Sequence, residues 1–177
     1  MLNSQSPTLR TATHADALCL GVLASQVFLD TYATSGIRAA IASEVLTSFS
    51  TTAMHALLDR DDGVVAIAEH AGHLIGFVQL GFGVQNHLIA SPVPAELERL
   101  YVQERFTGHG VGAALLCHAE RIAGARGVSD VWLSAWVHNQ RALRFYTRQS
   151  YLDIGAMDIW IEGERHLNRV LWKRLAP

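Results

Sequence analysis

Hydrophobic and polar residues follow different patterns along the first half of the chain. Residues 8–13 alternate and predict a strand, whereas residues 14–32 and 37–58 predict helices, the second in one piece or two. Residues 64–71 and 74–82 are apolar runs joined by a His-Ala-Gly-His turn, which is typical of a β-hairpin. This half of the chain therefore predicts one strand, helices and an antiparallel pair.

Strands and helices alternate in the second half. The predicted elements are strands at 96–102, 131–137, 151–160 and 165–174, with helices at 111–125 and 139–149. A strand–helix–strand unit predicts a parallel pair, whereas hairpins pair antiparallel. We therefore expect a single α/β (α+β) domain over residues 1–177, built on a central mixed sheet.

Composition excludes several classes of protein. Half of the 177 residues are hydrophobic and 17% are charged, which is typical of a globular domain. A net charge of -2 without a basic stripe gives no reason to expect nucleic-acid binding. We expect no membrane span, no signal peptide and a cytoplasmic location. Nine histidines show no ligand spacing, so no metal is expected, and Cys19 and Cys117 are expected to be reduced, buried thiols.

The segment from Glu96 to Gly112, ELERLYVQERFTGHGVG, carries the strongest chemical signal. It ends in three glycines at alternate positions, directly before a predicted helix. Glycine allows positive φ, so successive N–H groups can turn toward one point. The unbonded N–H groups and the positive dipole end of a helix form an anion site. The segment therefore predicts a site for a phosphate-bearing cofactor, although tight packing alone also produces such turns.

Two other phosphate-binding motifs fit poorly. The P-loop requires Gly-Lys-Ser/Thr, but Gly112 is followed by Ala113 and Ala114. The dinucleotide fingerprint has Ala113 in place of its third glycine, and Asp130 stands at the distance of its acidic residue. That fingerprint normally opens the first strand–helix unit, whereas this segment lies past the middle of the chain.

A second group of polar residues lies on the helix predicted at 139–149. Asn139, Ala142 and Tyr146 are spaced i, i+3 and i+7, which places them on one face. An amide, a small residue and a phenol in a row suit a slender ligand. Alternatively, Asn139 only caps the helix and Tyr146 is a half-buried aromatic residue.

Together, the two segments resemble the GNAT superfamily of acyl-CoA-dependent N-acyltransferases. Arg105-x-x-Gly108-x-Gly110 is similar to the pyrophosphate-binding signature of that family. Residues 139–146 resemble its second cofactor motif, N-x-x-A-x-x-F-Y. The resemblance implies a mostly antiparallel sheet of about six to seven strands with a splayed parallel pair, flanked by about four helices.

The resemblance covers residues 74–175 well and the first sixty residues only by helix count. It implies acceptor-side helices in residues 1–63 and a cofactor-binding core in residues 64–177. Trp136 and the Phe28-x-x-Thr31-Tyr32 pattern resemble the branch that acetylates polyamines and similar small amines. Members of the family often dimerise, so a homodimer is possible by resemblance.

The resemblance also implies acetyl-CoA as the acyl donor. Its pyrophosphate would bind the glycine loop, and its pantetheine arm would lie between the strand of Tyr101 and the strand at 131–137. The implied cofactor-binding residues are Leu100, Tyr101, Val102, Arg105, Thr107, Gly108, His109, Gly110, Val111, Gly112, Ala113, Asn139, Ala142 and Tyr146.

Amide formation requires a deprotonated amine, a polarised carbonyl and a protonated leaving thiolate. By resemblance, Tyr146 would protonate the thiolate, the N–H of Val102 would bind the carbonyl, and Glu98 or Glu96 would be the base. Strand alternation places both glutamates on the face of Leu100 and Val102. Alternatively, these carboxylates are exposed and pair with arginines.

The expected function is transfer of an acetyl group from acetyl-CoA directly to the primary amine of a small molecule. Two alternatives stay open: acetylation of protein N-termini or lysines, and a non-catalytic acyl-CoA-binding module. The sequence departs from the family pattern at Ser150-Tyr151, where relatives usually have Gly-Phe, and at Asn168, where relatives often have Asp.

Overall fold

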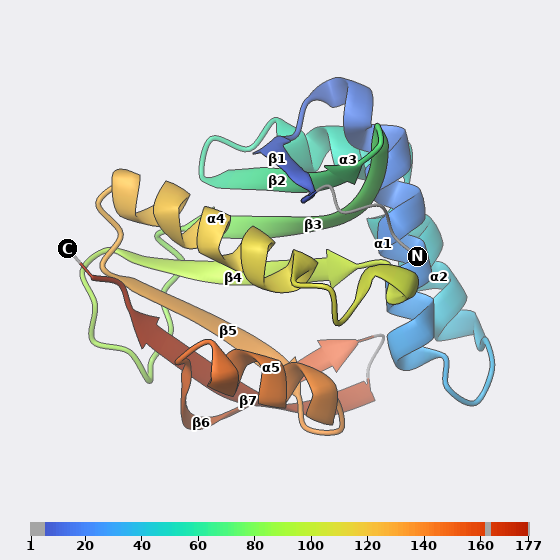
Figure 1. Cartoon of the computed structure of the whole chain (residues 1–177). Coiled ribbons are helices and arrows are strands. Elements are labelled where there is room, and N and C mark those ends of the chain that lie inside the picture. Colours follow the sequence, from blue (N-terminus) through green and yellow to red (C-terminus); the bar gives the residue numbers. More distant parts are fainter. Residues whose placement is uncertain (1–5, 162–163, 177) are drawn as a thin grey trace. The chain divides into compact units, whose positions relative to one another are not determined.

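The computed structural model describes residues 6–161 and 164–176, and Figure 1 labels its elements. The described residues form five α-helices: α1 (Ala17–Tyr32), α2 (Ala39–Ser48), α3 (Thr51–Leu58), α4 (Val111–Ala125) and α5 (Gln140–Arg148). Two short 3-10 helices are η1 (His14–Asp16) and η2 (Glu104–Phe106). The strands are β1 (Thr8–Thr11), β2 (Gly63–His70), β3 (His73–Phe82), β4 (Pro94–Val102), β5 (Asp130–Trp136), β6 (Leu152–Ile161) and β7 (Glu164–Arg174).

The strands form one mixed sheet in the order β1-β2-β3-β4-β5-β7-β6. The pairs β1–β2, β5–β7 and β6–β7 are antiparallel, whereas β4 and β5 are parallel. The β4–β5 register covers residues 94–96 and 130–132, although β4 continues to Val102 and β5 to Trp136. The predicted mixed sheet with one splayed parallel pair is therefore confirmed.

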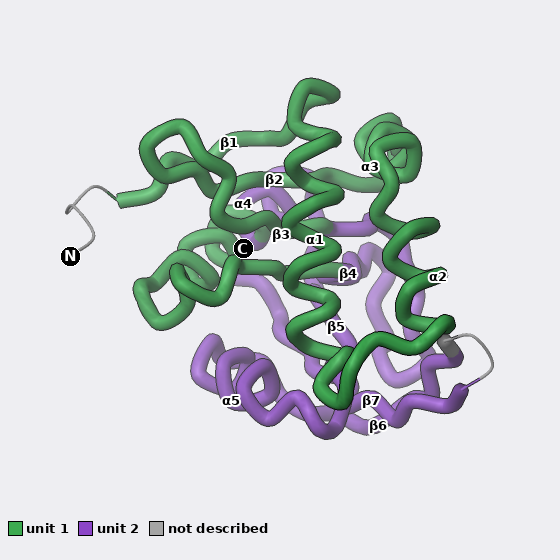
Figure 2. The backbone as a smooth tube through the Cα atoms, turned by 90° about the vertical axis from the view of Figure 1, so that its right-hand side faces the viewer, with its two compact units in different colours: residues 1–79, 99–119 green, residues 80–98, 120–177 purple. Residues whose placement is uncertain are grey.

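Contacts divide the chain into two compact units, which Figure 2 colours separately. Unit 1 comprises residues 1–79 and 99–119, and unit 2 comprises residues 80–98 and 120–177. The boundary runs through β3, β4 and α4 and does not follow the division at residue 63 expected from the sequence. Whether the chain acts as a single domain stays a prediction.

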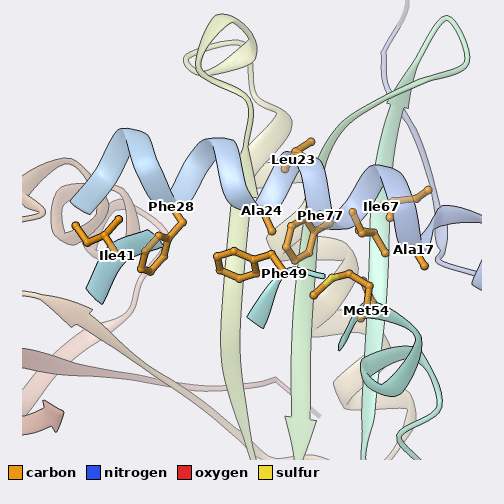
Figure 3. Packing of buried hydrophobic residues seen from close by; sticks show 11 residues of the cluster. Ala17, Leu23, Ala24, Phe28, Ile41, Phe49, Met54, Ile67 and Phe77 are labelled. Carbon is orange, nitrogen blue, oxygen red and sulfur yellow. The ribbon is translucent and has the colours of Figure 1, made fainter. Parts of the chain in front are cut away.

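The core of unit 1 lies between α1 and the strands β2 and β3. Figure 3 shows Ala24 and Phe28 of α1 turned toward Phe49, and Phe77 of β3 beside them. Gly21 allows this close packing, because a Cβ at that position would overlap with the carbonyl oxygen of Phe49. The helix thus turns a face rich in small residues toward its neighbours. Burial of such an apolar cluster is the main favourable term in folding.

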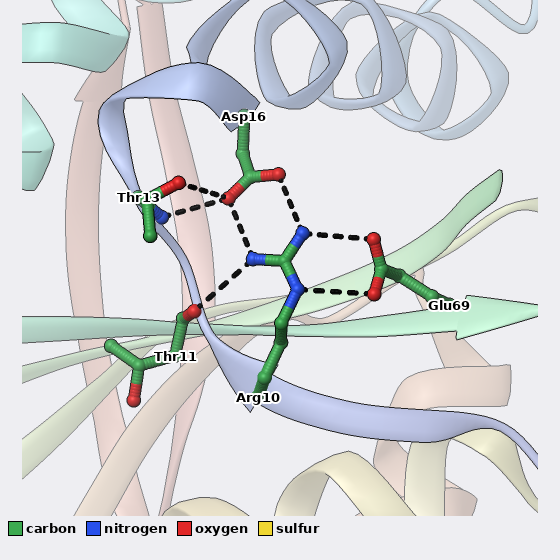
Figure 4. A network of polar contacts seen from close by, with 5 residues as sticks. All are labelled: Arg10, Thr11, Thr13, Asp16 and Glu69. Carbon is green, nitrogen blue, oxygen red and sulfur yellow. Dashed lines mark hydrogen bonds and ion pairs between the residues drawn. The ribbon is translucent and has the colours of Figure 1, made fainter. Parts of the chain in front are cut away.

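An ion-pair network joins the first strand of unit 1 to its neighbours (Figure 4). The Arg10 guanidinium donates to both carboxylate oxygens of Asp16 at 2.8 Å and to both of Glu69 at 2.8 and 3.0 Å. Asp16 also accepts the N–H of Thr13 at 2.7 Å, which closes the first turn of η1. These bonds to Arg10 hold the pKa of Asp16 well below its usual range. One side chain therefore holds β1, η1 and β2 together.

Unit 2 is built on β5, β7 and β6, and α5 lies alongside β5 and β7 in both views (Figures 1 and 2). The connection between β3 and β4 is fastened to these strands. The Trp132 indole donates to the carbonyl of Val84 at 2.9 Å, and the Ser91 hydroxyl donates to Asp130 at 2.6 Å. A Cβ at Gly155 of β6 would overlap with Leu88. This connection, expected to be a loop, is therefore anchored at several points.

Two details differ from what the pattern of residues suggests. Cys19 and Cys117 are exposed, so the prediction of buried thiols is wrong: each lies on the outer side of its helix. On α1, Leu18 and Val22 are 63% and 64% exposed, while the smaller Ala17 and Ala24 are buried. The buried side of α1 combines these small residues with Leu20, Leu23 and Phe28. The small residues permit close contact with neighbouring elements.

Among the described residues, no helix combines the length and apolar character needed to cross a bilayer.

Candidate active site

The glycine loop lies between η2 and α4 in unit 1. Gly108 and Gly110 have φ values of +76° and +83°, a conformation that residues with a Cβ rarely adopt. A Cβ at either position would have no atom within 4 Å, so packing does not explain these glycines. The loop is exposed here. The backbone of the loop is therefore accessible to a ligand.

The backbone of α4 begins directly at this loop. Its first intrahelical bond runs from the N–H of Ala114 to the carbonyl of Gly110 at 2.9 Å. The N–H groups that precede Ala114 therefore have no acceptor within the helix. The positive end of the helix dipole lies at the same place. The geometry fits an anion such as the pyrophosphate of coenzyme A, and Val111, Gly112 and Ala113 are the residues that would bind it.

Side chains around the loop support its shape. Thr107 donates its hydroxyl to the carbonyl of Glu104 at 2.8 Å, and the His109 ring contacts the carbonyl of Thr107 at 2.8 Å. Arg105 is exposed and lies over the Phe106 ring, 5.3 Å from its centroid. The predicted positive charge is therefore beside the loop, free of any ion pair among the residues that the structure describes.

The end of β4 presents its backbone at one edge. The N–H of Gln103 bonds the carbonyl of Ile75 in β3 at 3.0 Å. Since successive N–H groups of a strand point to opposite edges, the N–H of Val102 points away from β3. Gly76 lies against this stretch: its Cβ would be 2.8 Å from the carbonyl oxygen of Tyr101 and 3.3 Å from Val102. Val102 is thus placed to donate to a group outside the β3–β4 ladder.

The side chains of β4 do not alternate strictly between the two faces of the sheet. Gln79 and Gly81 of β3 share one face of the sheet. Arg99 donates to Gln79 at 2.6 Å, while a Cβ at Gly81 would overlap with the carboxylate of Glu98. Two successive residues of β4 therefore turn to the same face, as in a β-bulge.

The prediction that Glu98 shares a face with Val102 is thus wrong, because strict alternation cannot show such a reversal. Val102 contacts Gly76 on the face of Leu115 in α4. Glu96 and Glu98 are both half-buried. The alternative in which these glutamates pair with an arginine stays open, because Glu96, Glu98 and Arg121 each make a further interaction in the structure.

The second predicted group lies in unit 2, on α5. The Asn139 side-chain oxygen accepts the N–H of Ala142 at 3.0 Å, so Asn139 does cap the helix. This cap uses the oxygen and leaves the amide nitrogen for another role. Tyr146 is 8% exposed, and its ring meets those of Phe145 and Tyr151 edge to face, with centroids 5.1 and 5.7 Å away. Tyr146 is therefore held rigidly by packing.

A buried polar group stands behind Tyr146. The Tyr151 hydroxyl donates to Glu120 at 3.1 Å, and the Lys173 ammonium donates to both oxygens of Glu120 at 2.8 Å. Burial first, and then the charge of Glu120, raise the pKa of Tyr151 far above its usual value. Tyr151 therefore stays a neutral donor. In the sequence, Tyr151 stands out only as a departure from the Gly-Phe pair of relatives.

Asp130 is buried and hydrogen-bonded within the protein, so it is not available to bind a cofactor. It is 1% exposed and accepts hydrogen bonds from Ser91, Ser129 and Trp172 at 2.6, 2.6 and 3.0 Å. Burial acts to raise the pKa of Asp130, but these bonds and one from Arg174 outweigh it and lower that pKa. The acidic residue of a dinucleotide fingerprint must reach a ribose, which this carboxylate does not.

Within the part of the chain that the structure describes, no group of three or more His, Cys, Asp or Glu side chains is placed to hold a metal ion.

Residues 35–151 match the acetyltransferase (GNAT) family. The chain belongs to this family. The family and the class of enzyme predicted from the sequence are therefore confirmed, and GNAT enzymes use acetyl-CoA. Which branch of the family the chain represents stays a prediction.

The relatives agree with this membership. An uncharacterized N-acetyltransferase of Lactobacillus delbrueckii subsp. lactis is 31% identical over 104 residues, which are 59% of this chain and 60% of that protein. Among solved structures, a PaiA N-acetyltransferase from Thermoplasma acidophilum in complex with coenzyme A has a TM-score of 0.74 and 24% identity, covering 96% of this chain and 99% of that one. A ribosomal-protein-alanine N-acetyltransferase from Brucella melitensis has a TM-score of 0.74 and 21% identity, covering 95% and 99%. At these identities the solved structures support the fold alone.

Proposed function

We propose that this GNAT chain transfers an acetyl group from acetyl-CoA directly to the primary amine of a small molecule. One observation carries the proposal: Gly108 and Gly110 hold positive φ next to open space, immediately before α4. A backbone of this form binds the pyrophosphate of a coenzyme through N–H groups. The positive charge of Arg105 strengthens such binding.

The second half of the proposed cofactor site is α5. Asn139, Ala142 and Tyr146 share one face of that helix, and the small side chain of Ala142 leaves room beside the other two. We assign the coenzyme's arm to this face and to the backbone of Leu100, Tyr101 and Val102. The direction of the Val102 N–H, away from β3, supports its role as donor to the thioester carbonyl.

The transfer forms a C–N bond and breaks the C–S bond, so two protons must move. Glu98, or Glu96 two residues earlier, takes the proton from the amine. Tyr146 gives its hydroxyl proton to the departing thiolate, whose acidity is close to that of a phenol. Rigid packing of the Tyr146 ring between Phe145 and Tyr151 supports this role, because proton donors must be fixed in place.

An acceptor screen with thiol detection tests the proposal. A panel of small primary amines and peptides with free N-termini is incubated with acetyl-CoA, and free thiol and acetylated product are measured together. We expect amine-dependent thiol release with an equal amount of acetylated small amine. Turnover of peptides alone would favour a protein acetyltransferase. Binding of acetyl-CoA without turnover of any acceptor would favour a binding module.

The choice between the glutamates is tested by Glu98→Gln and Glu96→Gln. The variant that loses the base should lose rate at neutral pH and regain part of it at high pH, where the free amine is abundant. The other variant should keep the wild-type dependence on pH. Equal profiles for both variants would remove the assignment of a base to β4.

A further inference from the structure

Arg99 lies in an unusual setting on β4 of unit 1. Its guanidinium is half-buried, donates to the side-chain oxygen of Gln79 at 2.6 Å, and lies 5.5 Å from the centroid of the Phe49 ring. Gln79 is only 2% exposed, and Phe49 and Phe77 line the same core beneath α1 (Figure 3). A charged group has thus been brought to the edge of an apolar cluster.

The charge of Arg99 is not balanced by an ion pair. Among the described residues, Arg99 forms no ion pair with a carboxylate, whereas Arg10 pairs with two carboxylates and Arg169 and Arg174 with one each. A half-buried cation without a counter-ion is costly, and such groups are usually paired. Burial raises the pKa of Tyr101, which is hydrogen-bonded to Arg99, to about 12, so this phenol stays neutral. The charge of Glu44 reaches Tyr101 as well, but Glu44 forms no ion pair with Arg99 among the described residues.

The guanidinium has donors left for a further partner. Arginine carries five N–H groups in a planar fork, and the side chains of Gln79 and Tyr101 use only part of them. That bond and the Phe49 ring hold the fork in place. A planar fork is the group that binds a carboxylate with two parallel hydrogen bonds.

Arg99 lies next to a residue that is proposed to take part in the reaction. Arg99 directly follows Glu98, and the two side chains turn to the same face of the sheet. Glu98 is a proposed base for the amine. We infer that Arg99 and Gln79 form a subsite for the carboxylate of the acceptor, so that the amine acetylated by this chain is that of an amino acid. This inference rests on the proposed function and narrows its acceptor.

The test compares amino acids with their amides. The L-amino acids, β-alanine and 4-aminobutyrate are each assayed beside the matching carboxamide, which keeps the amine and removes the negative charge. We expect the wild-type chain to favour at least one amino acid over its amide by tenfold or more in kcat/KM. In Arg99→Met, which keeps a long apolar stem on Phe49, the ratio should fall to near one. Arg99→Lys, which keeps the charge without the fork, should give an intermediate ratio.

The control is Arg148→Met, which removes an exposed arginine at the end of α5 and should leave the ratio as in the wild type. Thermal unfolding and acetyl-CoA binding of each variant show whether it has folded. Two results would overturn the inference and leave the acetyltransferase proposal intact. One is a wild-type preference for amides or other uncharged amines. The other is an equal fall in kcat/KM for the amino acid and for its amide in Arg99→Met.

A second readout is independent of turnover. Calorimetric titration of the preferred amino acid in the presence of coenzyme A should give binding in the wild type that weakens tenfold or more in Arg99→Met. If no acceptor is acetylated, the proposed function fails, and this titration still decides the subsite. Absence of amino-acid binding to the wild type, or binding of equal strength in both proteins, would refute it.

Discussion

The backbone N–H of Tyr151 donates to the carbonyl oxygen of Tyr146 at 3.1 Å, and the two rings meet edge to face with centroids 5.7 Å apart. The N–H of Ser150 also bonds the carbonyl of Thr147 at 3.1 Å. Together these bonds form the Schellman motif that ends α5. The same turn that closes the helix therefore positions the ring behind the proposed proton donor.

Ser150 occupies the left-handed position of this motif, with φ of +66°, where glycine is the usual residue. We expect Ser150→Gly to raise the free energy of unfolding by about 1 kcal/mol, because a Cβ is disfavoured in this conformation. Denaturant unfolding measures the change. Gly127 ends α4 with a like motif and φ of +78°, so Gly127→Ser is the reciprocal control and should destabilise the chain. A loss of stability in Ser150→Gly would show that this turn is not under strain.

The glycine loop is tested by Gly110→Ala. The methyl group enters open space at a positive φ, so we expect a cost of about 1–2 kcal/mol in folding together with at least tenfold weaker acetyl-CoA binding. Gly127→Ala is the matched control at the other end of α4, because it also has positive φ and open space. It should show the same folding cost with unchanged affinity. Equal affinities of the two variants for acetyl-CoA would show that the loop does not bind the cofactor.

The network around Arg10 predicts a dependence of stability on pH. Since the pKa of Asp16 is lowered in the folded state, its contribution is complete above the unfolded-state pKa of about 3.9 and is lost as the pH falls toward the folded-state value. We expect Asp16→Asn to cost about 1–2 kcal/mol near pH 7, after allowance for the partly exposed Arg10, and less below pH 4.

Chemical unfolding of both proteins between pH 3 and pH 8 measures this difference. Asp62→Asn is a control, since Asp62 pairs with Arg60 on the surface with 66% of its side chain exposed, and its effect on stability should be small at every pH. A difference between wild type and Asp16→Asn that is independent of pH would contradict the assigned role of the ion pair.

Much of the fold could be predicted because local signals agreed with one another. The helix predicted at 111–125 matches α4, and the segment at 37–58 is two helices separated at Phe49 and Ser50. The hairpin at 64–82 was recognisable from its apolar runs, and the glycine loop from its spacing. Each of these features depends on residues that are neighbours in sequence.

The features that sequence could not show depend on contacts between distant residues. The reversal of face at Glu98 and Arg99 appears only against Gln79 and Gly81 of the neighbouring strand. The exposure of Cys19 depends on which side of α1 meets the sheet. Similarly, Arg99 was visible in the sequence only as one charge on β4, and its setting emerges from Gln79 and Phe49. The one available signal in the sequence was Gln79, a polar residue within the apolar run of β3 that could have been expected to bond a polar side chain of the neighbouring strand.

The most direct test of the central claim is a comparison of wild type and Tyr146→Phe in acetyl-CoA binding and single-turnover thiol release with an acceptor identified by the screen. Phenylalanine keeps the ring contacts with Phe145 and Tyr151 and removes the hydroxyl that carries the proposed proton. We predict an unchanged Kd for acetyl-CoA and a transfer rate reduced by about 100-fold, as for loss of a general acid. An unchanged transfer rate would contradict the account.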